Sequence, residues 1–112
     1  MISTHNAEHY RWGQDCDGWH LVKSSTLSVI QEFMPPGRSE VRHLHVASRQ
    51  FFFVLAGRLS IEVEGQLQVL SSQQGLEISP GQAHRVFNDS AGDSAFLVIS
   101  SPPSHGDRVL AE

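Results

Sequence analysis

Apolar residues recur along this 112-residue chain with the period of β-strands, and no stretch keeps the period of a helix. Leu59, Ile61 and Val63, for example, alternate with polar neighbours. Nine or ten such runs are separated by turn-forming residues. Their spacing of roughly 8–12 residues is typical of β-sandwiches and barrels. We therefore expect one all-β domain, closed or nearly closed, so that few strand edges are exposed.

The composition is that of an ordinary globular domain and argues against several classes of function. Hydrophobic residues make up 39% of the chain and charged residues 18%, which allows one packed core. The net charge is −4 and no basic block occurs, so nucleic acid is a poor partner. No apolar run approaches the roughly 18 residues of a membrane span, and the N-terminus lacks signal-peptide features. We expect a cytoplasmic protein that does not bind membranes.

Residues 1–23 are expected to form an N-terminal arm that could exchange strands between subunits, and residues 24–112 the barrel with a C-terminal cap. The arm carries Trp12 and Trp19. These large apolar side chains either pack on the outside of the domain or cover a dimer partner or the mouth of a pocket.

The C-terminal segment after Pro102 allows two interpretations. As a structural cap it would pair Asp107 with Arg108. Alternatively, it would bring His105 or Arg108 to the mouth of a pocket.

Three histidines and one glutamine occupy positions from which neighbouring strands can bring them together. His43 and His45 are two residues apart on one predicted strand and therefore point to the same face. Gln50 begins the next predicted strand, and His84 opens a third after the turn Pro80-Gly81. Imidazole-rich sites suit Zn, Cu, Fe and Ni. If these strands are neighbours, we expect one divalent transition metal (Zn, Ni, Fe, Mn or Cu) at His43, His45, Gln50 and His84.

The same alternation predicts a mainly apolar pocket around the metal, as is usual for small-molecule sites. Its expected lining comes from the faces that carry the four ligands and from the opening strand of the barrel, where Ile30 is the alternative to Phe33. The predicted lining residues are Phe33, Val41, Phe52, Val54 and Val86.

Charged residues near these strands are expected to lie on the solvated surface: Glu32, Glu40, Arg42 and Arg85. The predicted pocket therefore holds no obvious acid or base, and the sequence identifies no catalytic residue.

The spacing of the glycines, histidines and Gln50 resembles the first motif of the cupin family: Gly37, five residues, His43-x-His45, four residues, Gln50, six residues, Gly57. The run Pro80-Gly81-Gln82-Ala83-His84, followed three residues later by Asn88, looks like the second motif. The resemblance implies a double-stranded β-helix, that is, an RmlC-like jelly-roll barrel, and commonly a homodimer.

The chain departs from the family pattern in both motifs. Gln50 stands where the first motif usually has glutamate, and Ser79 replaces the first proline of the second motif. The second-motif glycine is shifted, as Gly75. An amide ligand brings no negative charge, so the metal would keep its full charge and acidify bound water more strongly.

The resemblance implies a metalloenzyme acting on a small organic molecule, by dioxygenase or by isomerase, lyase or cyclase chemistry. The three-histidine and glutamine set is similar to that of cupins that open unsaturated uronates and of cupin polyketide cyclases. In the uronate group, an aspartate and a phenylalanine occupy the positions of Val98 and Ser100, which argues against that activity. The alternative is a ligand-binding or sensing module without turnover.

Overall fold

The computed structural model describes residues 1–112 and consists of eleven strands. They are β1 (Glu8–Trp12), β2 (Cys16–Lys23), β3 (Ser28–Met34), β4 (His43–His45), β5 (Arg49–Ala56), β6 (Leu59–Val63), β7 (Gln66–Leu70), β8 (Gly75–Ile78), β9 (His84–Phe87), β10 (Ser94–Ser101) and β11 (Arg108–Leu110). No helix in it is long and apolar enough to cross a membrane.

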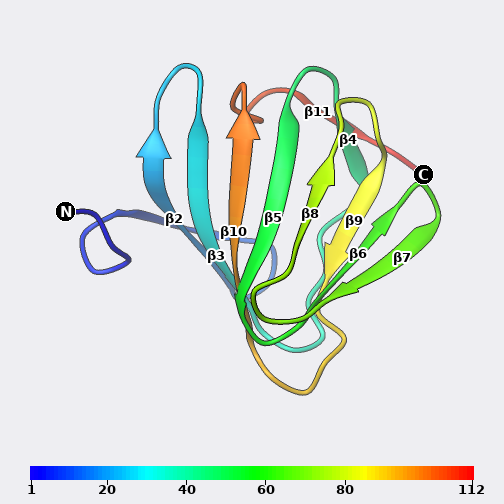
Figure 1. Cartoon of the computed structure of the whole chain (residues 1–112), viewed down its shortest axis with the longest axis horizontal. Coiled ribbons are helices and arrows are strands. Elements are labelled where there is room, and N and C mark those ends of the chain that lie inside the picture. The colour runs from blue at the N-terminus through cyan, green and yellow to red at the C-terminus, as the bar shows by residue number, and fades with distance from the viewer.

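The strands form two antiparallel sheets whose strand orders interleave distant parts of the chain (Figure 1). The six-stranded sheet has the order β1-β2-β3-β10-β5-β8, and the five-stranded sheet has the order β11-β4-β9-β6-β7. From β3 onwards the chain passes repeatedly from one sheet to the other, as in a jelly roll, so β4 and β5 lie in different sheets although only three residues separate them. The predicted all-β double-stranded β-helix is confirmed.

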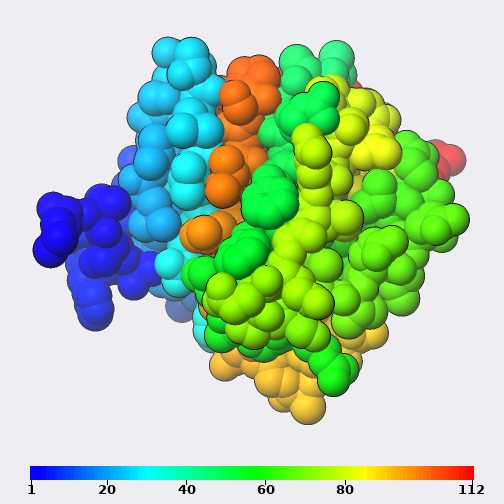
Figure 2. Space-filling model, in the orientation of Figure 1, coloured from blue at the N-terminus to red at the C-terminus, as the bar shows by residue number.

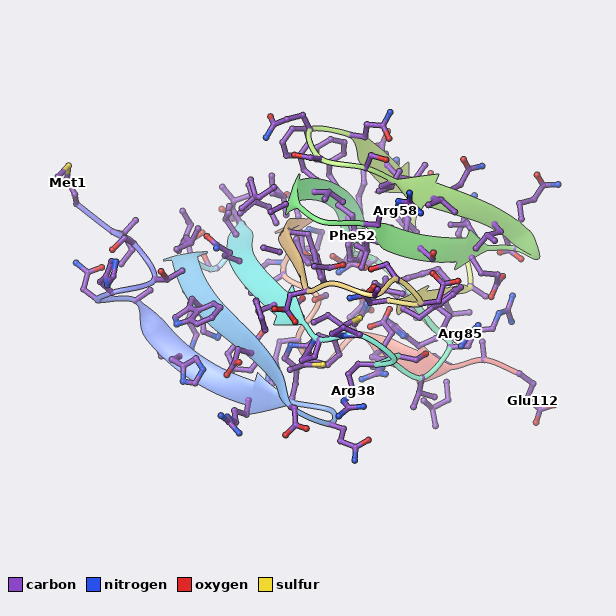
Figure 3. All side chains as sticks on the ribbon, turned by 90° about the horizontal axis from the view of Figure 1, so that it is seen from below. Met1, Arg38, Phe52, Arg58, Arg85 and Glu112 are labelled. Carbon is purple, nitrogen blue, oxygen red and sulfur yellow. The ribbon has the colours of Figure 1, made fainter.

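Side-chain alternation places the core between the sheets. On β5 and β10 every second residue is buried, including Phe52, Val54, Phe96 and Val98. Phe52 lies near the centre of the molecule in the view from below (Figure 3). Leu59 and Ile61 of β6 have no exposed area and close the core from the other sheet. One continuous apolar cluster thus ties both sheets together.

Both ends of the chain join the sheets. β1 and β2 pair with each other and β2 pairs with β3, so most of the predicted arm extends the six-stranded sheet. The first residues, dark blue in Figure 2, project from its side. The C-terminal segment contains β11, which pairs with β4. Residues near both termini therefore help to build the barrel.

Replacement of Ile61 by alanine tests the position of the core. Ile61 is completely buried, so Ile61→Ala should lower the free energy of unfolding by about 2–5 kcal/mol through lost burial and a cavity. Leu67 lies on the neighbouring strand β7 with 57% of its surface exposed. Leu67→Ala should therefore change the free energy of unfolding by no more than about 0.5 kcal/mol. Chemical denaturation measures both, and equal losses would contradict this core.

Candidate metal centre

Antiparallel pairing of β4 with β9 brings the three histidines together. His43 on β4 is the register partner of His84 on β9, and their ring centroids lie 4.5 Å apart. His45, two residues after His43, points to the same face, with its ring centroid 4.9 Å from that of His43. One imidazole nitrogen of each histidine lies within 4.8 Å of those of the other two, and all three residues are buried. This is the donor arrangement of a transition-metal site.

The turn before β9 fixes the approach of His84. Gly81 has φ +83°, a left-handed conformation that glycine adopts without strain, and its N–H donates to the His45 carbonyl at 2.7 Å. The Gln82 side chain closes the turn by accepting the Ser79 N–H at 2.8 Å. The turn therefore ties the start of β9 to the strand that carries His45.

Backbone carbonyls orient two of the imidazoles. Nδ1 of His43 lies 2.7 Å from the Val41 carbonyl, and Nδ1 of His84 lies 2.9 Å from the Gln82 carbonyl. A carbonyl only accepts, so each Nδ1 carries the proton and each Nε2 offers its lone pair. Metal-binding histidines commonly have such carbonyl partners.

Gln50 reaches the site from β5 in the opposite sheet. Its Nε2 donates to the Ser100 hydroxyl at 3.1 Å, and its Oε1 is buried without a hydrogen-bond partner. Nδ1 of His45 and Nε2 of His84 are also buried without partners. A buried polar atom without a partner costs about 1–3 kcal/mol, so a bound ligand that contacts these atoms would recover that cost. Three imidazoles and one amide oxygen fit a divalent transition metal.

Burial keeps the three histidines in the neutral form that a metal requires. Desolvation is the largest cause in each case; it lowers the pKa of His43 to about 4 and also lowers the pKa values of His45 and His84. The neighbouring histidines oppose protonation of His43 and His45 further. At neutral pH a metal would therefore displace few protons.

A cavity of about 270 Å³ adjoins His43, His45 and Gln50. Of the five predicted lining residues, Phe52 and Val86 lie in its wall. Val54 lies deeper, fully buried in the core. Val41 is 60% exposed because it precedes the short strand β4, where alternation does not apply.

The remaining predicted lining residue, Phe33, lies on the face of β3 that points away from the cavity. Ile30 and Glu32 line the cavity, and Ser28 and Met34, which share their parity, are buried. Alternation therefore directs Phe33 to the opposite face of the sheet.

Two carboxyl groups line the cavity, so the expectation of a pocket without an acid or base was wrong. Glu32 shares the inward face of β3. Glu40 is turned inward by Val86: its N–H donates to the Val86 carbonyl, and its Oε1 accepts the Val86 N–H, both at 3.0 Å. Desolvation raises the pKa of each carboxyl group to about 8, and the charge of Glu40 adds to the effect on Glu32.

The two arginines behave as expected from the sequence and stay away from the cavity. Arg42 forms an ion pair with Glu62 at 2.9 Å, and the Arg85 guanidinium lies over the ring of Phe87, 4.4 Å from its centroid.

The C-terminal segment both caps the barrel and lines the cavity. The Asp107 carboxylate accepts the backbone N–H groups of residues 46–48 at 2.8–3.1 Å rather than pairing with Arg108. This latch fixes the segment so that His105 and Arg108 lie in the cavity wall. Arg108 forms no salt bridge, and its charge lowers the pKa of Glu40.

Trp12 of the N-terminal strand β1 also lies in the cavity wall, with its indole N–H donating to the Asp17 carbonyl at 3.3 Å.

Comparison with known proteins gives a family match over most of the barrel. Residues 30–100 match the family described as the cupin domain. A segment of 70 residues is 33% identical to polyketide synthase CurC from Streptomyces cyaneus. This segment covers 62% of the chain but 45% of the Streptomyces protein, so the chain spans less than half the length of that relative.

Solved structures share the fold at low sequence identity. An RmlC-like cupin from Shewanella frigidimarina superposes with a TM-score of 0.83 at 17% identity, covering 93% of this chain and 91% of that one. A structure described as a predicted oxalate decarboxylase from Thermotoga maritima gives 0.84 at 16% identity, covering 92% and 99%. Likeness at this identity establishes the architecture alone.

The raised pKa values of the two carboxyl groups predict a specific dependence of stability on pH. Between about pH 4.5 and 8 the folded state retains protons that the unfolded chain has lost, so stability falls as the pH rises through this window. Glu32→Gln removes one of these groups. It should leave the free energy of unfolding almost unchanged near pH 4.5 and raise it by roughly 2 kcal/mol or more near pH 9.

Denaturation of wild type and Glu32→Gln across this range checks the prediction. Glu77→Gln, at an exposed residue that pairs with Arg49, is the matched control and should show no such gain. A pH-independent difference between Glu32→Gln and wild type would show that Glu32 titrates normally.

Proposed function

The chain belongs to the cupin family, and from this premise we propose that it is a metal-dependent enzyme acting on a small organic molecule inside the barrel. His43, His45, His84 and Gln50 would hold one divalent transition metal. The proposal is carried by one observation: buried nitrogen and oxygen atoms of His45, His84 and Gln50 lack protein partners within the same site. A metal ion satisfies all of them at once.

We further propose that the reaction is non-oxidative, of the isomerase, lyase or cyclase kind. When bound, a divalent metal with four neutral ligands supplies a strong Lewis acid that polarises a substrate oxygen. Glu32 and Glu40 offer groups that can hold or move a proton in the same cavity. The similarity to polyketide synthase CurC supports a substrate that carries carbonyl groups. A dioxygenase reaction needs no such carboxyl groups.

A homodimer is proposed as well. Apolar side chains of β7 and β11 are exposed in the single chain: Leu67, Val69, Val109 and Leu110. Contact with a second copy would remove them from water. Exchange of residues 1–23 between subunits is a further proposal: β1 and β2, which here extend β3 of their own chain, would pair with β3 of the partner. A molar mass in solution equal to one chain would refute the dimer.

Metal content is the direct test of the site. Wild-type protein purified without an affinity tag should contain close to one divalent transition metal per chain by elemental analysis. His84→Ala should lose most of it because one buried donor disappears, whereas Gln50→Glu should retain or tighten binding because it adds a negative ligand. His5→Ala, at an exposed N-terminal histidine, is the control and should keep the wild-type content. Equal content in wild type and His84→Ala would refute the site.

Oxygen dependence separates the two reaction classes. With carbonyl-bearing substrates, turnover by the metal-loaded protein should continue at an unchanged rate under anaerobic conditions, and an oxygen electrode should record no uptake. Stoichiometric uptake would replace the non-oxidative assignment with a dioxygenase. Metal-loaded protein that binds such compounds without converting them would favour the ligand-binding module.

A further inference from the structure

Glu32 is the one acidic side chain of the cavity that is left free by the protein. Its carboxyl group forms no hydrogen bond or salt bridge within the chain, although it lines the cavity together with His43 and Gln50. Glu40, in contrast, is fixed by two hydrogen bonds to the Val86 backbone. The two carboxyl groups therefore differ in what they can do, since only Glu32 can turn toward a bound molecule.

The first two strands shape the surroundings of Glu32. Gly18 on β2 is the register partner of both Tyr10 on β1 and Glu32 on β3. A Cβ atom at Gly18 would lie 2.4 Å from the Tyr10 ring, so the ring occupies the space that a side chain would fill. This glycine lets Tyr10 lean over β2, and Tyr10 lies in the cavity wall together with Glu32.

The same cavity wall also carries Gln50, one of the proposed metal ligands. Gln50 is only 5% exposed, and its Oε1 has no partner. Its amide is held from behind by Ser100, which leaves that oxygen directed to the site. The cavity thus combines an unsatisfied metal-binding face with a free carboxyl group.

We propose that Glu32 is the catalytic acid–base residue of this cavity. This inference rests on the proposed function, because it assigns the proton-transfer step of that enzyme. The substrate class is a small carbonyl compound with an acidic C–H group next to the carbonyl carbon.

The step needs no oxidant or reductant. The Glu32 carboxylate takes the proton from the carbon beside the carbonyl group, and the electron pair of that C–H bond moves through carbon to the carbonyl oxygen. The enolate that forms is reprotonated by the Glu32 carboxyl group at the same or another position. Atoms and charge balance, and Glu32 returns to its starting state.

The charges around Glu32 suit this role. The Tyr10 phenol, whose pKa burial raises, stays neutral. The nearby Cys16 thiol, with its pKa raised to about 11 chiefly by burial, is neutral as well. Arg108 acts on Glu40 and the histidines, and Glu40 raises the pKa of Glu32. Desolvation makes the Glu32 carboxylate a stronger base than an ordinary solvated glutamate.

Hydrogen–deuterium exchange provides a test without knowledge of the natural substrate. Zinc-loaded protein in D₂O is mixed with acetylacetone or pyruvate, and ¹H NMR follows the loss of the C–H signals. Wild type should accelerate the exchange of at least one probe. Glu32→Gln should reduce the enzymatic rate by roughly 100-fold or more, with zinc content unchanged. Glu77→Gln, on the outer surface, should match wild type.

Failure of this inference is distinguishable from failure of the proposed function. Wild-type exchange in Glu32→Gln, or no acceleration of either probe by zinc-loaded wild type, would overturn the role of Glu32 while the metal site stands. A wild-type protein that binds no metal would overturn the proposed function itself.

Discussion

The pairing of His43 on β4 with His84 on β9 is the contact on which the site depends. β4 has only three residues, and His43 and His84 form the one register pair that joins it to β9. The strand is secured from its other side by β11, which pairs with all three of its residues, and by the Asp107 latch on the following loop. The last residues of the chain therefore hold in place the strand that carries two of the proposed ligands.

Several buried polar groups inside the barrel lower the stability of the fold. Neutral histidines, an amide oxygen without a partner and two carboxyl groups occupy space that apolar side chains would fill at lower free-energy cost. A bound metal and a polar molecule would supply partners to these groups and so reduce the cost of burying them. The apolar cluster around Phe52 and Phe96 supplies the burial that offsets this cost.

The sequence predicted the architecture and the convergence of the three histidines because both depend on local periodicity. Strand alternation and the Pro80-Gly81 turn are sufficient to place His43, His45 and His84. Glu32 and Glu40 were missed for physical reasons. Alternation gives two faces of β3 without saying which is inward, and only the structure, by burying Ser28 and Met34, identifies the inward face. Glu40 lies outside any strand, where its direction depends on hydrogen bonds to Val86, 46 residues away.

A metal ion held by His43, His45, His84 and Gln50 is the central claim, and anomalous X-ray diffraction from metal-loaded crystals tests it most directly. Data collected at the absorption edge of the metal should give one strong peak inside the barrel. That peak should lie about 2.0–2.2 Å from one nitrogen of each histidine and from Oε1 of Gln50. A peak elsewhere on the protein, or no peak between the two sheets, would contradict the account.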